Sequence, residues 1–494
     1  MFFTNITMGS NDIRTFFTKF AHGNSNTIAL PDVKDLKEIY QPPDTLSQLN
    51  PQQRMAFDAI IAKKSIFLTG PGGTGKSFLL ETLHAHYKTQ SKKKLAITAM
   101  TGCAAVLIGS FAKTLHSWAG IGLGRGDMEA IATMVASDKR KGPRWRQTGC
   151  LVIDEVSMMT PALLELLDMV GRKARKCLDQ PFGGMQMVFV GDFYQLPPVS
   201  REGHGHFAFD SPLWNQVVKE THFLTEIVRQ KDPIFQTILN EARIGSLSQV
   251  SYDILESRKT MDWKRQEIKP TLLFTKNTDV SQINETQLKK LPGEEYVFVA
   301  KTESPPQMTR DVVKMLSDKL DKDAPYEVEL RLKDRAQVML LKQYYEEKED
   351  DKGKKTMSPI HGLVNGSRGV VVGFALDGNP IVKFLNGRTI TVKPATWSSD
   401  DEPGAVKREQ IPLRVAYALT IHKAQGASLD SALVDVGPST FECGQAYVAL
   451  SRVRNLESLF IFEISSKAFR AHSAVKAFYE SINQKLSCNT ELAE

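Results

Sequence analysis

Eight residues near the start of the chain combine the features needed to hold a chain of phosphates. They read Gly70-Pro71-Gly72-Gly73-Thr74-Gly75-Lys76-Ser77, which fits the phosphate-binding loop pattern. In such a loop, bare backbone N–H groups and the positive end of a helix dipole face the phosphates. We expect Lys76 to reach the β- and γ-phosphates of a nucleotide and the Ser77 hydroxyl to bind magnesium. The alternative is a glycine-rich turn that binds no ligand.

The residues around the loop favour phosphate binding. Residues 65–69 are a short apolar run typical of a buried strand, and residues 78–87 predict a helix. An amphipathic helix is also predicted over residues 51–60, with Pro51 at its start. Gln53 in that helix suits recognition of the adenine edge through its amide. The alternative for Gln53 is an exposed helix residue.

Polar side chains follow two further predicted strands. Asp154 and Glu155 come directly after the apolar residues of a strand at 151–155. Beside a phosphate loop, Asp154 suits the magnesium shell and Glu155 suits polarisation of the attacking water. Gln195 follows a strand predicted at 185–190, where a glutamine near the γ-phosphate can sense hydrolysis.

Other segments suit contact with nucleic acid. A strand predicted at 95–99 runs into Thr101 and Gly102, which open a helix whose N–H groups suit a phosphate of either a nucleotide or a nucleic acid. Trp118 could stack on a base or belong to the core, and the sequence leaves both open. In residues 119–146, glycines at 120, 122, 124 and 126 are followed by a basic run that contains Trp145. This insertion could touch or split nucleic acid, or could be a solvated loop.

Size and composition allow two to four domains in 494 residues. The net charge of +7 permits binding to a polyanion without requiring it. The sequence contains no apolar run of membrane-spanning length. The five cysteines lack metal-ligand spacing, so we expect a reducing compartment and no structural zinc. The ten dispersed histidines argue against a metal-dependent nuclease.

The first 44 residues have no clear periodicity and are predicted to form a tail. Within it, Ile13, Phe16 and Phe17 resemble the peptide that docks into replication sliding clamps, although Ser10 stands where such peptides usually begin with glutamine. An apolar anchor against the body of the protein is the favoured alternative. A mitochondrial transit peptide is a third option, weakened by Asp12 and by the sparse arginines.

Several motifs together resemble the PIF family (petite integration frequency) of superfamily-one DNA helicases. The resemblance is carried by Pro-Phe-Gly-Gly-Met-Gln at 181–186, by Gly-Asp-Phe-Tyr-Gln-Leu-Pro-Pro at 191–198, and by residues 114–122. It covers about residues 45–482, and the RecD and Dda helicases are more distant relatives. The resemblance implies movement from 5′ to 3′ on single-stranded DNA and unwinding of duplexes with ATP and magnesium.

The same resemblance implies roles for residues in the second half of the chain. Arg229 and Arg452 match two arginines that reach the γ-phosphate. Thr420, His422 and Lys423 match a motif that contacts DNA, while Gln425 and Gly426 would couple that contact to the nucleotide. The predicted DNA contacts also include His116, together with Thr101, Gly102 and Trp118.

The predicted fold class is α/β, with two RecA-like domains built on parallel sheets. The first comprises residues 45–118 and 147–223, interrupted by the basic insertion at 119–146. The second comprises residues 224–325 and 406–494, and it begins with a strand at 224–230. Residues 326–405, in which the hydrophobic period changes to two, predict a small β-barrel inserted in the second domain. The family resemblance implies that this barrel is SH3-like.

The predicted function is therefore that of an ATP-dependent DNA helicase in replication, repair, recombination or telomere maintenance. One alternative is a single-strand translocase or remodeller without net unwinding. Another is a non-catalytic nucleic-acid scaffold, and an RNA helicase is less favoured. We expect a monomer, with no membrane partner, in the nucleus or another compartment that contains DNA. A mitochondrial or viral replication site stays open.

Overall fold

The computed structural model describes residues 45–491 except 91–93, 110, 123, 125, 199–205, 264–268, 276, 324, 343–344, 350–354, 360–362, 364–365 and 399–405. The peptide with Ile13, Phe16 and Phe17 lies outside these residues, so clamp binding stays a prediction. The elements described below belong to the unit formed by Leu49–Glu494. Of the helices in the described residues, none is long and apolar enough to cross a membrane.

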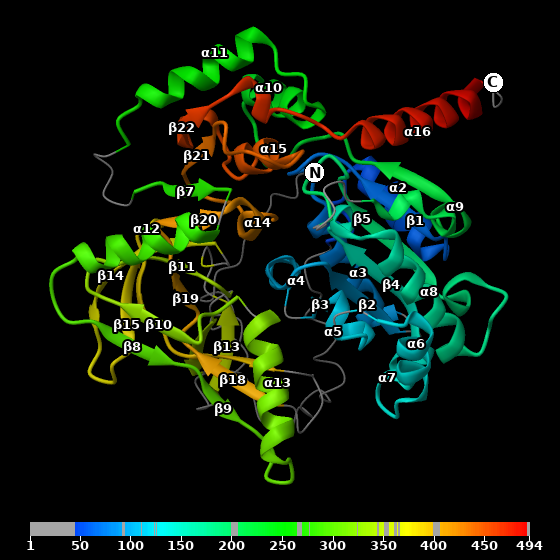
Figure 1. Cartoon of the computed structure of the whole chain (residues 1–494), viewed down its shortest axis with the longest axis horizontal. Helices are drawn as coiled ribbons and strands as arrows, with labels where there is room; N and C mark the ends of the chain where they lie inside the picture. The colour runs from blue at the N-terminus through cyan, green and yellow to red at the C-terminus, as the bar shows by residue number, and fades with distance from the viewer. Residues whose placement is uncertain are drawn as a thin grey trace, which may run out of the picture. The chain divides into compact units, whose positions relative to one another are not determined.

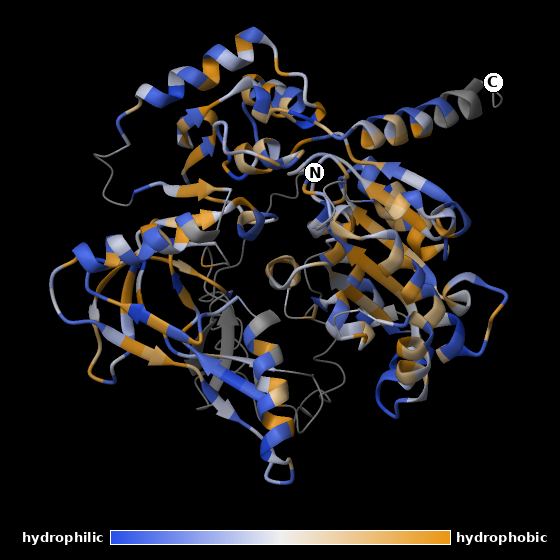
Figure 2. Cartoon of the chain, in the orientation of Figure 1, coloured by the Kyte–Doolittle hydropathy of each residue, from blue (hydrophilic) through white to orange (hydrophobic). Residues whose placement is uncertain are grey.

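Six parallel strands form the first sheet, in the order β3-β2-β4-β5-β1-β6. They are β1 (Ile66–Thr69), β2 (Lys94–Ala99), β3 (Lys113–Thr114), β4 (Thr148–Asp154), β5 (Gln186–Gly191) and β6 (Glu220–Phe223). The central strands β1 and β5 are buried along their whole length, and the strands of this sheet are largely apolar (Figure 2). Such continuous apolar runs are typical of a parallel sheet covered on both faces. The strands predicted at 65–69, 95–99, 151–155 and 185–190 are confirmed.

The order and register of this sheet bring the phosphate loop and the carboxylates together. Thr69, at the end of β1, lies opposite Gly191 of β5, and β4 lies on the other side of β5. Because all strands are parallel, the segments that follow β1, β4 and β5 leave the sheet at the same edge. The predicted nucleotide residues follow these three strands.

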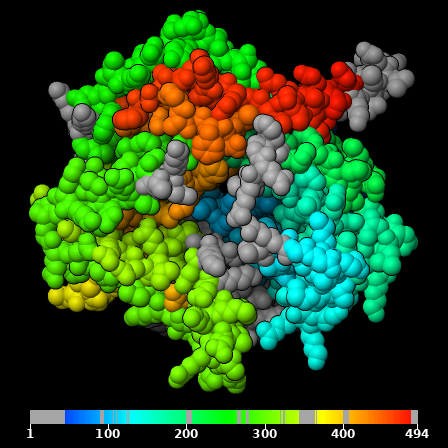
Figure 3. All heavy atoms as spheres, viewed as in Figure 1, coloured from blue at the N-terminus to red at the C-terminus, as the bar shows by residue number. Residues whose placement is uncertain are grey.

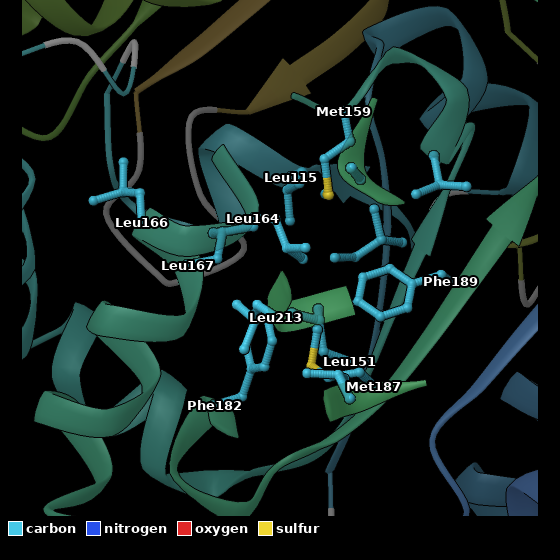
Figure 4. Packing of buried hydrophobic residues seen from close by; sticks show 14 of the residues in the cluster. Leu115, Leu151, Met159, Leu164, Leu166, Leu167, Phe182, Met187, Phe189 and Leu213 are labelled. Carbon is cyan, nitrogen blue, oxygen red and sulfur yellow. The ribbon is translucent and has the colours of Figure 1, made fainter. Parts of the chain in front are cut away.

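Helices and a large apolar core support the first sheet (Figure 1). The helices are α2 (Pro51–Ile61), α3 (Lys76–Gln90), α4 (Gly102–Ile108), α5 (Leu115–Ala119), α8 (Pro161–Arg175) and α9 (Pro212–Val217). Side chains from β4, β5 and α8 meet in this core, together with Phe182 (Figure 4). The helices predicted at 51–60 and 78–87 are thus confirmed.

The basic insertion is helical rather than a solvated loop. It contains α6 (Met128–Ser137) and α7 (Lys141–Gln147), and both pack against α8. Trp145 on α7 is fully buried, and its indole N–H donates to the Ala119 carbonyl at 3.1 Å. The aromatic residue of the insertion therefore belongs to the core, while the neighbouring basic residues Lys139 and Arg140 are exposed.

Four parallel strands form the second sheet, in the order β20-β7-β21-β22. They are β7 (Thr271–Phe274), β20 (Ala418–Thr420), β21 (Ala432–Val436) and β22 (Leu459–Ile464), accompanied by α10 (Pro233–Ile244), α11 (Gln249–Ser257), α12 (Asn277–Lys290), α14 (Ile421–Ala424) and α15 (Gln445–Leu450). The strand predicted at 224–230 is wrong. Residues 224–230 contain no strand, and the nearest strand, β6, pairs with β1 of the first sheet. The backbone of this segment instead bonds to the phosphate loop, as described below.

An antiparallel β region follows the first strand and helix of the second domain. Its largest sheet has the order β16-β15-β14-β11-β19. The elements are β8 (Tyr296–Val299), β9 (Lys301–Glu303), α13 (Arg310–Asp323), β10 (Glu329–Leu332), β11 (Gln337–Leu340), β12 (Tyr345–Glu349), β13 (Lys355–Pro359), β14 (Arg368–Phe374), β15 (Pro380–Phe384), β16 (Thr389–Thr391), β17 (Ala395–Ser398), β18 (Lys407–Gln410) and β19 (Leu413–Val415). Strands β8, β9, β18 and β19 lie outside 326–405 but pair with strands of this region or with one another. The predicted bounds of the insertion are therefore too narrow.

The C-terminal helix α16 (Ser473–Glu491) returns to the first sheet. Val475 and Tyr479 belong to the core of that sheet, and Phe478 stacks on Phe209 at 4.1 Å. The predicted second domain includes all of 406–494, but α16 does not pack with that domain. Its apolar side chains are buried in the core of the first domain.

A buried ion pair lies where α16, α10 and the first sheet meet. Arg243 of α10 bonds to both oxygens of Asp192, at 2.8 and 2.9 Å, and Asp192 is fully buried. The Tyr479 hydroxyl lies 2.7 Å from the Thr69 hydroxyl and accepts from the Phe193 N–H at 3.1 Å. Burial alone would lower the pKa of Arg243, but Asp192 raises it above its ordinary value.

Removing one partner of this pair tests its contribution to stability. We expect Arg243→Ala to lower the free energy of unfolding by about 3–5 kcal/mol, because it leaves the Asp192 carboxylate buried without its cation. Urea unfolding followed by circular dichroism measures the change. Arg54→Ala is the control, since Arg54 pairs with Asp58 on the surface. An unchanged unfolding midpoint in Arg243→Ala would contradict the assignment.

Candidate functional site

The phosphate loop joins β1 to α3, as its sequence predicts. Gly70 and Gly73 both have positive φ angles. A Cβ atom on Gly70 would lie 2.1 Å from the Leu224 carbonyl oxygen, so only glycine fits there. Gln53 donates its side-chain N–H to the Thr74 carbonyl at 3.2 Å and lies against Gly75. Gln53 is buried, so the exposed alternative is excluded.

Lys76 is held on the loop itself. Its Nζ atom donates to the Gly70 carbonyl at 2.7 Å and to the Pro71 carbonyl at 2.9 Å. Burial lowers the pKa of Lys76, and the nearby carboxylates of Asp192, Glu155 and Asp154 oppose that shift. The ammonium group is therefore a desolvated cation at the place where a triphosphate would bind.

Two buried carboxylates face Lys76. Burial and the neighbouring Glu155 raise the pKa of Asp154 to about 7. Burial also raises the pKa of Glu155, against the opposing effects of Lys76 and Arg452. Gln425 donates its amide to Glu155 Oε2 at 3.0 Å and lies 3.4 Å from Gln195 Oε1. Glu155, directly after β4, and Gln195, which lies four residues after β5, are thus both in contact with Gln425 of the second domain.

Two arginines approach from the other side of the cavity. Arg229 donates to the Ser451 carbonyl at 3.4 Å, and Arg452 donates to the carbonyls of Val448 and Ala427 at 2.7 and 3.2 Å. Burial lowers the pKa of Arg229, and burial together with Arg229 lowers the pKa of Arg452 to about 9. These cations are desolvated close together, so a bound polyanion would relieve their repulsion.

The predicted nucleotide residues converge on one cavity of about 280 Å³. Its lining residues are Gly72, Gly73, Gly75, Lys76, Ser77, Asp154, Glu155, Gln195, Val228, Arg229, Gly426 and Arg452. Gly70 and Gln425 bond to members of this set, Thr74 lies in the loop between Gly73 and Gly75, and Gln53 bonds to the Thr74 carbonyl. The donor set also suits magnesium, because the Ser77 hydroxyl and the Asp154 carboxylate line the same space.

The predicted DNA contacts lie on two helix starts. Thr101 caps α4 and Thr420 caps α14, each through its side-chain oxygen, while Gly102 is the first residue of α4. The two helices are neighbours: a Cβ atom on Gly426 would lie 2.9 Å from Leu107 of α4. Figure 3 shows blue atoms from the first part of the chain at the floor of a hollow, with orange atoms from the second part at its rim. Both segments therefore come together although about 320 residues separate them.

The two titratable candidates on α14 differ in exposure: His422 is half-buried and Lys423 is exposed. Burial lowers the pKa of His422, so its imidazole is neutral near pH 7. Burial and Arg414 lower the pKa of Lys423, while Cys103 at the start of α4 raises it. The neighbourhood of Lys423 and Cys103 again places α14 beside α4.

Trp118 lies in the core, which decides between its two interpretations. Its ring is buried and lies 4.8 Å from that of Trp145. Stacking of Trp118 on a base does not fit this position, because the ring faces the apolar core of the first domain. His116, two residues earlier on α5, is half-buried and keeps its predicted role as a proposal.

Sequence reasoning missed three residues that contact the site. The Tyr447 hydroxyl accepts from the Gly72 N–H at 2.7 Å, and Gln230 and Asp192 lie behind the loop and Lys76. Each is adjacent to a recognised motif residue, but nothing in its type or spacing marks it as part of a phosphate site.

Comparison with known proteins agrees with this geometry. The model of the PIF1-like helicase family matches residues 48–255. The ATP-dependent DNA helicase PIF1 of Xenopus laevis is 36% identical over 466 residues, which cover 92% of this chain and 68% of that protein. This chain belongs to the PIF1-like helicase family.

Solved structures of PIF1-like helicases share the fold. The Pif1 helicase from Candida albicans aligns with a TM-score of 0.72 and 33% identity, over 88% of this chain and 99% of that chain. The Bacteroides Pif1 helicase in complex with ADP-AlF3 and ssDNA aligns with a TM-score of 0.61 and 27% identity, over 88% and 97% of the two chains. The two parallel sheets and the β insertion are therefore those of this family.

Removal of either cation tests the nucleotide site. We expect Lys76→Ala and Arg452→Ala to abolish ATP hydrolysis and to leave binding to single-stranded DNA largely intact, because both side chains face the cavity and not the α4–α14 hollow. Steady-state ATPase rates and fluorescence anisotropy with a labelled oligonucleotide measure the two properties. Lys467→Ala, an exposed lysine of the second domain, is the control. A normal rate of ATP hydrolysis in either variant would contradict the assignment of that residue to the nucleotide site.

Proposed function

We propose a mechanism by which this chain performs the ATP-dependent DNA helicase activity of its family. We also propose that it moves from 5′ to 3′ along DNA. The observation that carries the proposal is the shared cavity, in which Lys76 and Glu155 of the first domain face Arg229 and Arg452. The named activity of the Xenopus relative and the ligands of the Bacteroides relative support it. The direction rests on the family resemblance.

The cavity residues have different roles in ATP hydrolysis. Lys76 leaves the loop carbonyls and binds the β- and γ-phosphates. Glu155 in its ionised form takes a proton from the attacking water, and Lys76 and Arg452 favour that ionised form. Arg229 and Arg452 stabilise the negative charge that develops on the γ-phosphate, a contribution of about 10³–10⁵ in rate for an arginine finger.

Ser77 and Asp154 would hold magnesium. Their hydroxyl and carboxylate oxygens are ligands that magnesium accepts. Asp154 is buried beside a second carboxylate, which raises its pKa, and a divalent cation at this place would offset that repulsion. When bound, magnesium supplies charge neutralisation for the phosphates.

Gln425 couples the cavity to DNA. It bonds to Glu155 and lies beside Gln195, and it directly follows α14. A change around the γ-phosphate can therefore shift α14 relative to α4. We propose that Thr101, Gly102 and His116 on one side and Thr420, His422 and Lys423 on the other grip the strand in alternation.

The remaining proposals extend beyond the described site. Sliding-clamp binding through Ile13, Phe16 and Phe17, action as a monomer, and location in a reducing compartment that contains DNA stay predictions from the sequence. The domain bounds are kept as proposed, except for the changes that the β region, residues 224–230 and α16 require.

Unwinding of tailed duplexes tests activity and direction together. With ATP and magnesium, we expect strand separation of a duplex with a 5′ single-stranded tail, and none of a duplex with a 3′ tail or blunt ends. A gel or fluorescence-quenching assay measures the products. Unwinding from the 3′ tail would overturn the direction, and DNA-stimulated hydrolysis without any unwinding would favour a translocase.

The DNA contacts on α14 are tested separately. We expect the double variant His422→Ala/Lys423→Ala to weaken binding to single-stranded DNA by about tenfold or more, because aligned polar contacts are each worth about 1 kcal/mol and charged ones more. Hydrolysis without DNA should be retained. Oligonucleotide anisotropy and basal ATPase rates measure both, with Lys467→Ala as control. Unchanged affinity at physiological salt would show that α14 does not bind the strand.

A further inference from the structure

Gln230 lies between the two arginines of the nucleotide site. It follows Arg229 in the chain and is fully buried. Its side-chain amide donates to the Ser451 carbonyl at 3.4 Å and to the Val453 carbonyl at 3.0 Å. Those two carbonyls flank Arg452. Because carbonyl oxygens only accept hydrogen bonds, both contacts must be made by the amide nitrogen.

The phosphate loop packs against the same two residues. The Gly73 carbonyl accepts from the N–H groups of Val228 and Arg229 at 2.8 and 3.1 Å. Gly73 has a φ of +88°, and a Cβ atom there would lie 2.7 Å from Arg229 Cβ and 2.8 Å from Gln230 Oε1. The loop, Arg229 and Gln230 therefore have one close-packed arrangement.

A further contact fixes the backbone of Gln230. Gln236 on α10 donates its side-chain amide to the Gln230 carbonyl at 2.6 Å. The side-chain oxygen of Gln230 is buried and has no hydrogen-bond partner among the described residues. Burying an amide oxygen without a hydrogen-bond donor costs folding free energy. The hydrogen bonds that the Gln230 side chain does make are those that its amide nitrogen donates to the two carbonyls.

We propose that Gln230 is a positioning residue that sets the spacing between Arg229, Arg452 and the phosphate loop. It does not face the cavity itself, since it is absent from the cavity lining. Its effect on hydrolysis passes through the two arginines, and the inference rests on the proposed function. Because a displacement of about 1 Å can cost about a hundredfold in rate, the spacing matters for the chemical step more than for nucleotide binding.

Gln230→Met tests the proposal, because methionine has a similar length and no donor. We expect kcat for DNA-stimulated ATP hydrolysis to fall about tenfold to a hundredfold. The KM for ATP and the Kd for single-stranded DNA should stay within about twofold. Gln249→Met is the matched control, since Gln249 is exposed and bonds to Asp253 on the surface of α11. If Gln230→Met does not fold, Gln230→Asn keeps the amide on a shorter chain and should show the same split.

A binding cycle separates positioning from general damage. The affinity for ADP with aluminium fluoride, which mimics the transition state, is measured in wild type, Gln230→Met, Arg452→Ala and the double variant. We expect Gln230→Met to weaken this complex and not the complex with ADP, and to cause a smaller further loss in the Arg452→Ala background than in wild type, because part of its effect passes through Arg452. Additive losses, equal losses for ADP, or an unchanged kcat would overturn the proposal. A wild-type protein without DNA-stimulated hydrolysis would instead refute the proposed function.

Discussion

Burial of opposite charges around a phosphate loop is the interaction on which the rest of this structure depends. Lys76, Glu155 and Arg452 all lose water on folding, and their altered pKa values have burial as the largest cause. A desolvated charge is tolerated only when partners surround it. Two carboxylates and two arginines on opposite sides of one cavity meet that condition in part, and ATP with its metal would complete it.

This arrangement requires that two sheets be held together beside the loop. Residues 224–230 run from the first sheet to α10, and their backbone bonds to Gly73. The helix α16 follows the second sheet and packs into the core of the first. The Arg243–Asp192 pair lies between these connections. These three connections join the two domains beside the phosphate loop. Each contacts residues of β1, of the loop itself, or of the segment that directly follows β5.

The proposed coupling between nucleotide and DNA uses few atoms. Gln425 bonds to Glu155, and the helix before it begins at Thr420 with its predicted DNA contacts. Because the helix is only one turn long, a small change at Gln425 is transmitted directly to its other end.

Local patterns in the sequence predict much of the nucleotide site and the presence of the β insertion. The apolar strand before a Gly-Lys-Ser loop and the carboxylates after Ile153 identify the nucleotide site, because backbone N–H groups and strand ends can be arranged this way by short segments alone. The period-two segments after about residue 326 likewise indicated a β insertion. Its bounds were too narrow, since β9, β18 and β19 are too short for their patterns to be distinguished.

Contacts between distant segments could only come from the tertiary structure. Trp118 is core because Trp145 lies against it, and α16 joins the first domain because Phe478 and Tyr479 find apolar partners there. The burial of Gln230 between two carbonyls is of the same kind. The sequence by itself determined which residues can hold phosphate, since that depends on residue type and local backbone. Which side chains surround them was decided by packing, because burial depends on neighbours that the sequence does not place.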